Sequence, residues 1–259
     1  MKKFFDVLSI LAIMLALATT AFAKDEVLEN AFVKVDKAYI PPLFFTSAMA
    51  MGSTVASMNA YKAAWAEFKT NYYDYKPDYA NWQTYFDTVD AANLKADGII
   101  KAAFAANNPQ LLPPAHDALE VVRETMLELR EHNGFSKFIT DKQTLFHEPM
   151  EAIVLSLKGL TPLQVTEELK AALRAELPLA MKTWSDIEKC PVDAEQWLLT
   201  AAQTTAYYGY LVAERTRLEA FQTALDADDN LLIIQTGMAL KPVFVESYKI
   251  FGSFSLYVR

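Results

Sequence analysis

The chain has three histidines, His116, His132 and His147, and all of them lie near its middle. Two of them begin the same five-residue pattern, because a glutamate follows four residues later, at Glu120 and at Glu151. Residues four apart on an α-helix are neighbours on one face, and imidazole and carboxylate groups are ligands of transition metals. We therefore interpret His116, Glu120, His147 and Glu151 as candidate ligands of one metal ion.

Other metal and haem centres find less support in the residue pattern. A ferritin-like di-iron centre uses Glu-x-x-His pairs, which the sequence lacks, and covalent c-type haem needs Cys-x-x-Cys-His, whereas the only cysteine is Cys190. Met49, Met51 and Met58 are close in the sequence and could supply thioether ligands to copper. Only Met51 and Met58 share a helical face, which favours core packing over copper binding. Non-covalent haem has no spacing signature, so a transition metal ion or such a haem is the cofactor we expect.

The positions of the two histidines relative to the predicted core differ. His116 lies at the border of the apolar stripe of its helix, where a histidine hydrogen-bonded to a carboxylate is the simplest interpretation. His147 and Glu151 lie opposite the core face of the next helix if that helix is straight, as a surface pair would. A break at Pro149 would instead place His147 at a helix junction.

A second candidate surface is the aromatic segment around a predicted turn at Lys76-Pro77. Its rings carry polar tips, which suits a small ligand or a partner protein, although packing between helices is the simpler interpretation. This surface would make the protein a sensory or interaction module. The residues are Tyr72, Tyr73, Tyr75, Tyr79 and Trp82.

An enzyme ranks third among the function classes. Cys190 sits beside Pro191 with no histidine near it in the chain, so we interpret it as structural. Glutamates and histidines on helices are too common to count as evidence for acid–base catalysis. The leading hypothesis is therefore a non-enzymatic binding protein.

The elements that must position these side chains are all helical. The 259 residues include only seven glycines, and alternating strand patterns are missing, so we predict an all-α, multi-helix bundle. Asn133-Gly134 marks one helix end, and Pro149, Pro178 and Pro242 should kink or split their helices. The predicted helices are residues 25–37, ending before Pro41-Pro42, and 43–75, 78–106, 111–132, 136–158, 162–189, 193–226 and 230–251.

A weak internal repeat appears at an offset near 120 residues. Residues 103–108 match residues 224–229, and Trp65 and Trp82 fall opposite Trp184 and Trp197. We predict two pseudo-repeated three-helix halves, residues 43–132 and 162–252, joined by a bridging helix over residues 136–158. Together they form one domain, residues 24–259.

The first 23 residues have the pattern of a cleavable signal peptide. Lys2 and Lys3 precede an apolar run, and Ala21-Phe22-Ala23 is a cleavage site. We therefore expect a periplasmic protein without a membrane-spanning segment in the mature chain. The formal charge of −8 argues against nucleic acid, which requires basic patches. We expect a small ligand, a metal ion or a periplasmic protein as partner.

Overall fold

The computed structural model describes residues 26–75, 81–135 and 138–257, and in these residues it confirms the all-α prediction. Residues 26–47 form the first described helix. The helices that follow are α2 (Met51–Tyr72), α3 (Trp82–Ala105), α4 (Pro113–His132), α5 (Ile139–Leu157), α6 (Glu167–Lys189), α7 (Ala201–Asp226), α8 (Asn230–Met238) and α9 (Leu240–Lys249), with short 3₁₀ turns at Pro109–Leu111, Pro162–Gln164 and Phe254–Leu256.

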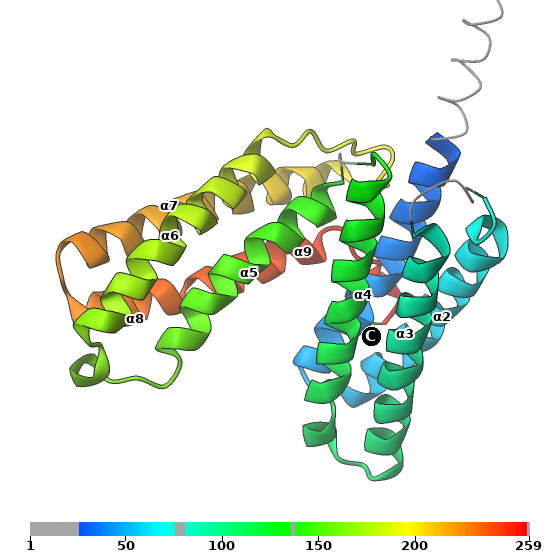
Figure 1. Ribbon diagram of the computed structural model, residues 1–259, viewed down its shortest axis with the longest axis horizontal. Helices are drawn as coiled ribbons and strands as arrows, with labels where there is room; N and C mark the ends of the chain where they lie inside the picture. Colours follow the sequence, from blue (N-terminus) through cyan, green and yellow to red (C-terminus); the bar gives the residue numbers. More distant parts are fainter. Residues whose placement is uncertain (1–25, 76–80, 136–137, 258–259) are drawn as a thin grey trace, which may run out of the picture.

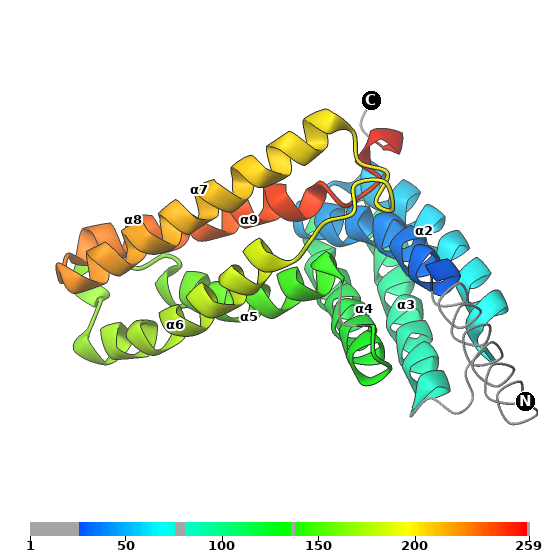
Figure 2. The same cartoon turned by 90° about the horizontal axis from the view of Figure 1, so that it is seen from above.

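These helices form two bundles that meet at an angle (Figures 1 and 2). Residues 26–47 pack with α2, α3 and α4 in the first bundle, while α5 to α9 form the second. The chain passes from one bundle to the other between α4 and α5. Side chains that face each other across these two helices therefore lie at the junction of the molecule.

Each bundle has an aromatic core. In the first, the ring of Phe32 contacts the rings of Phe68 and Trp82, with centroids 5.1 and 6.4 Å apart. In the second, Phe146 contacts Trp184 at 4.7 Å. Large rings bury enough apolar surface to dominate the packing energy, which explains how the chain forms a stable core without a disulfide.

The first described helix continues through Pro41 and Pro42, so the predicted end near residue 37 is wrong. A proline cannot donate a hydrogen bond to the carbonyl four residues earlier, which leaves the oxygen of Lys37 free. The backbone N–H of Ser253 donates to that oxygen at 2.9 Å. A distant part of the chain thus satisfies the group that proline leaves unpaired, and burial of Ile40 stabilises the same turn.

Several other predicted boundaries change. The expected helix over residues 43–75 is interrupted at residues 48–50. Asp193 caps a short turn, whereas α7 begins after Thr200, whose side chain and that of Gln203 form a capping box. Pro149 and Pro178 lie inside α5 and α6 without splitting them. The split expected near Pro242 does occur, at residue 239.

The predicted bridging helix belongs to the second bundle. The helix α5 packs along α6 and also contacts α8 and α9. These contacts bury most of its residues. The matched segments 103–108 and 224–229 do share one turn geometry: Asn108 N–H donates to the carbonyl of Ala103 and Asp229 N–H to that of Ala224. A repeat over the whole length of the two halves stays a prediction.

The junction is held by a buried ion-pair cluster. Arg130 on α4 donates to Asp141 on α5 and, at 3.2 Å, to Asp36 on the first helix. Thr140 donates to Asp36 at 2.6 Å. The cluster therefore connects the first helix and α4 to α5, and loss of one partner would leave an uncompensated buried charge.

The predicted signal peptide, residues 1–23, lies outside the described residues. Among the helices that are described, none combines the length and the apolar character needed to cross a bilayer.

Candidate metal centre

Two helices with well-defined ends present the four candidate ligands. Pro113 and Pro114 begin α4, where a missing N–H costs little. At its other end Phe135 N–H donates to the carbonyl of Arg130 and Gly134 N–H to that of Glu131, with Gly134 at a φ of 83°. This is the glycine-dependent helix end that the sequence predicted, and it turns the chain into α5.

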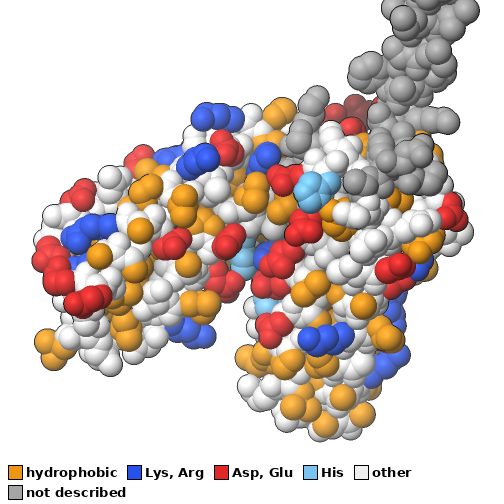
Figure 3. Space-filling view, viewed as in Figure 1, with side chains coloured by type: hydrophobic (Ala, Val, Ile, Leu, Met, Phe, Trp, Pro, Cys, Tyr) orange, Lys and Arg blue, Asp and Glu red, His pale blue; other side chains and the backbone are white. Residues whose placement is uncertain are grey.

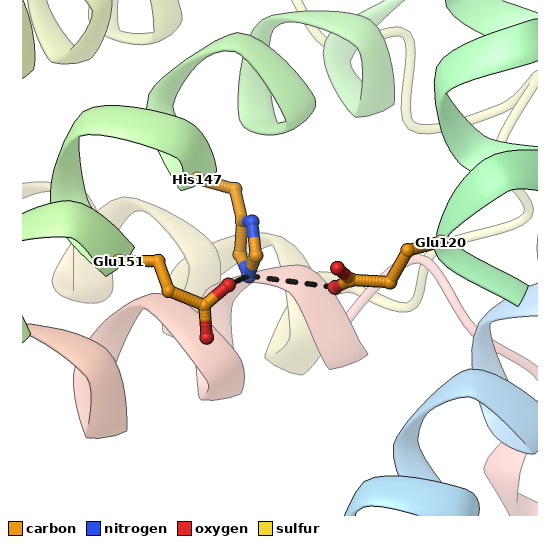
Figure 4. A group of neighbouring side chains, drawn as sticks. All are labelled: Glu120, His147 and Glu151. Atoms are coloured by element: carbon orange, nitrogen blue, oxygen red, sulfur yellow. Dashed lines mark ion pairs between the residues drawn. The ribbon is translucent and has the colours of Figure 1, made fainter. Parts of the chain in front are cut away.

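Three of the four predicted ligands form a compact group across the α4–α5 junction. One ligand atom each of Glu120, His147 and Glu151 lies within 4.8 Å of the others. His147 Nε2 is 3.1 Å from Glu151 Oε2 and 3.8 Å from Glu120 Oε1. Figure 4 shows Glu120 reaching from one helix toward the His147–Glu151 pair on the other.

His116 joins this group through Glu120, as a boundary histidine beside a carboxylate. Its Nε2 atom is 3.4 Å from Glu120 Oε1. Its Nδ1 atom is 2.9 Å from the carbonyl oxygen of Leu43, and a carbonyl only accepts, so Nδ1 carries a proton. Nε2 faces the Glu120 carboxylate, which only accepts, so Nε2 must release the proton that it donates to Glu120 before it can bind a metal. Metal-binding histidines are typically oriented in this way, by donation from the other ring nitrogen.

The surface position expected for His147 is wrong, because its side chain is buried, with 8% exposure. The polar side of α5 faces α4 and α9 instead of solvent, and the His147 ring packs 5.7 Å from that of Phe244. Pro149 does not produce the expected junction, since α5 is continuous. Burial of this face is a consequence of how the two bundles meet.

Two cations complete the cluster. The guanidinium of Arg123, which is buried, lies 2.9 Å from His147 Nδ1 and 3.2 Å from Glu120 Oε1. Lys241 on α9 donates to Glu151 Oε1 at 2.6 Å. The charges of Glu120 and Glu151 are thus balanced by those of Arg123 and Lys241.

Burial and charge set the protonation states. Burial raises the pKa of Glu120, but the hydrogen bond from His116 and the charge of Arg123 outweigh it and lower the pKa to about 2. Burial, together with the charge of Arg123, lowers the pKa of His147 to about 4. At neutral pH Glu120 is ionised and His147 is neutral, which are the states that metal ligands require.

A cavity of about 60 Å³ adjoins His116, Glu120, Arg123, His147 and Lys241. This volume accommodates an ion with a few water molecules, since one water needs roughly 10–15 Å³. The remaining wall is mostly apolar and comes from the first helix and α9. It includes Ile40, Leu43, Phe44, Phe244, Val245 and Tyr248.

Acidic side chains surround the junction. Figure 3 shows them gathered, with histidine, in the notch between the two bundles. Glu124 lies on the exposed side of α4, where partial desolvation raises its pKa. Repulsion from the nearby carboxylates of Glu120, Glu148 and Glu128 raises this pKa further. A concentration of negative charge attracts cations to the notch.

The aromatic segment, the second candidate surface, is buried in part. Trp82 is buried, and its indole N–H donates to the carbonyl of Tyr72 at 2.8 Å. Tyr72, Tyr73 and Tyr75 are partly buried and pack against the core of the first bundle. Tyr79 lies outside the described residues. The simpler interpretation, packing between helices, fits Trp82, because its ring contacts those of Phe32 and Phe86.

Sequence reasoning missed the two cations of the cluster. Arg123 follows Glu120 by three residues, and its place beside the apolar stripe of α4 is a signal for burial. Lys241 carries no comparable signal, since it lies 90 residues from Glu151.

No known protein family, curated protein or solved structure matches the chain.

Proposed function

We propose that the protein binds a divalent transition metal ion between α4 and α5, through Glu120, His147 and Glu151, with His116 as a fourth ligand. The observation that carries this proposal is that ligand atoms of Glu120, His147 and Glu151 lie within 4.8 Å of one another, with His147 Nε2 3.1 Å from Glu151 Oε2 and 3.8 Å from Glu120 Oε1. His116 Nε2 lies 3.4 Å from Glu120 Oε1. Two ligands of a tetrahedral Zn²⁺ ion, each about 2.1 Å from the metal, lie about 3.4 Å apart.

The mixture of nitrogen and oxygen donors favours a metal of the Zn²⁺ class. Imidazole suits zinc, copper, iron and nickel, whereas all-oxygen sites suit magnesium and calcium. Haem is disfavoured, because the cavity of about 60 Å³ is far smaller than the roughly 300–1,000 Å³ of organic-ligand sites. The signal-peptide pattern of residues 1–23 supports the further proposal that the protein acts in the periplasm.

Binding requires one rearrangement at His147. Arg123 can only donate, so neutral His147 accepts at Nδ1 and carries its proton on Nε2, toward Glu151. For Nε2 to bind a metal, the proton must move to Nδ1 and Arg123 must turn away from the ring. Glu120, which Arg123 already contacts, offers it an alternative acceptor. His116 is already oriented by the carbonyl of Leu43, and its Nε2 atom has only to release the proton that it donates to Glu120.

Titration of the purified protein with Zn²⁺ and with Co²⁺ tests the proposal. We expect one ion per chain by calorimetry, and a Co²⁺ absorption spectrum typical of tetrahedral coordination. The double variant His116→Ala, His147→Ala should lose binding, and Glu120→Gln should weaken it. His132→Ala is the matched control, because His132 contacts Tyr85 and lies outside the cluster. Failure of the wild type to bind either ion refutes the proposal.

A further inference from the structure

Lys241 is the cation of the cluster that can leave it. Its side chain is 34% exposed, whereas that of Arg123 is 7% exposed and lies between two helices. A lysine ammonium on a flexible, partly exposed stem returns to water without a large desolvation cost. Arg123, by contrast, is buried and keeps Glu120 as an acceptor when it turns away from His147.

The ammonium of Lys241 also occupies the same carboxylate that the metal would use. Glu151 Oε1 accepts from Lys241 at 2.6 Å, while Glu151 Oε2 faces His147 Nε2 at 3.1 Å. Lys241 lines the same cavity as His116 and Glu120. A divalent ion bound beside Glu151 would therefore lie within a few ångströms of a positive charge, which would repel it.

We propose that Lys241 is a tethered counter-ion, which neutralises Glu151 in the absence of metal and is displaced into solvent when a divalent ion binds. The inference rests on the proposed metal site and adds a residue that sets its affinity. An ion with a single charge gains no more from Glu151 than the tethered ammonium does. The lysine thereby selects divalent over monovalent cations, and it keeps the site neutral when it is empty.

The variant Lys241→Met tests this inference, because it keeps an unbranched, flexible side chain and removes its charge. We expect it to bind Zn²⁺ at least about tenfold more tightly than the wild type, because no Lys241–Glu151 ion pair has to be broken before the divalent ion binds. Lys249→Met is the matched control. Lys249 lies on the same helix and lines the same cavity, but its ammonium pairs with Glu246.

The outcomes separate this inference from the proposed function. Tighter binding by Lys241→Met, with Lys249→Met unchanged, supports the tethered counter-ion. Equal or weaker binding by Lys241→Met, while the wild type binds Zn²⁺, overturns it and leaves the metal site in place. If neither wild type nor Lys241→Met binds, the metal site itself fails. Far-ultraviolet circular dichroism of each variant verifies that the helices are intact, and Lys241→Gln provides a second uncharged variant.

Discussion

Replacing Glu214 by glutamine should stabilise the protein in a pH-dependent manner. Glu214 lies in the apolar stripe of α7, between Leu211 and Leu218, and its side chain is completely buried. Neither carboxyl oxygen has a hydrogen-bond partner among the described residues. Burial raises the pKa of Glu214 from 4.5 to about 8 and outweighs the opposing charge of Arg217.

The magnitude follows from the difference in proton binding between the folded and unfolded states. Unfolded Glu214 loses its proton near pH 4.5, whereas the folded protein keeps it up to about pH 8. The folded state binds more protons in this range, so the free energy of unfolding falls as the pH rises from 4.5 to 8. At pH 7, which is 2.5 pH units above 4.5, the cost is about 3 kcal/mol.

Thermal and urea unfolding of Glu214→Gln at several pH values measure this effect. We expect the variant to match the wild type near pH 4 and to be about 3 kcal/mol more stable at pH 7. For a chain of this size that corresponds to an increase in Tm of roughly 6–12 °C. Glu219→Gln, the same change on the exposed face of α7, should shift the Tm little at any pH. A stability difference between Glu214→Gln and wild type that is independent of pH would refute the reasoning.

Four further substitutions test other parts of the fold. Burial raises the pKa of Asp141 to about 6, so wild-type stability should fall between pH 4 and pH 6, and Asp141→Asn should flatten that slope in urea titrations. Gly237→Ala places a Cβ 2.4 Å from Leu157 Cδ1 and should lower the free energy of unfolding by about 1–2 kcal/mol. Gly209 has open space around it, so Gly209→Ala should raise the free energy of unfolding by up to about 1 kcal/mol. Thr200→Ala removes the capping box of α7 and should cost about 1 kcal/mol in the same assay; an unchanged urea midpoint would contradict the cap.

Local sequence signals predicted the helical class and several helix ends correctly. Asn133-Gly134 ends α4 because only a residue tolerant of positive φ fits there. The Pro41-Pro42 pair was misleading for the opposite reason. A proline in the sequence indicates only that its own backbone N–H is missing. The N–H that satisfies the freed carbonyl of Lys37 belongs to Ser253, more than 200 residues away.

The identities of the four candidate ligands were readable from the sequence, since a residue four positions along a helix is always a neighbour on the same face. Whether the pair on α4 meets the pair on α5 depends on the angle at which the bundles join, which no local pattern contains. The same long-range packing decides three other features of the site: His147 is buried, Arg123 lies beside it, and Lys241 approaches from α9. Helical period fixes which residues share a face, and only long-range packing decides which faces meet.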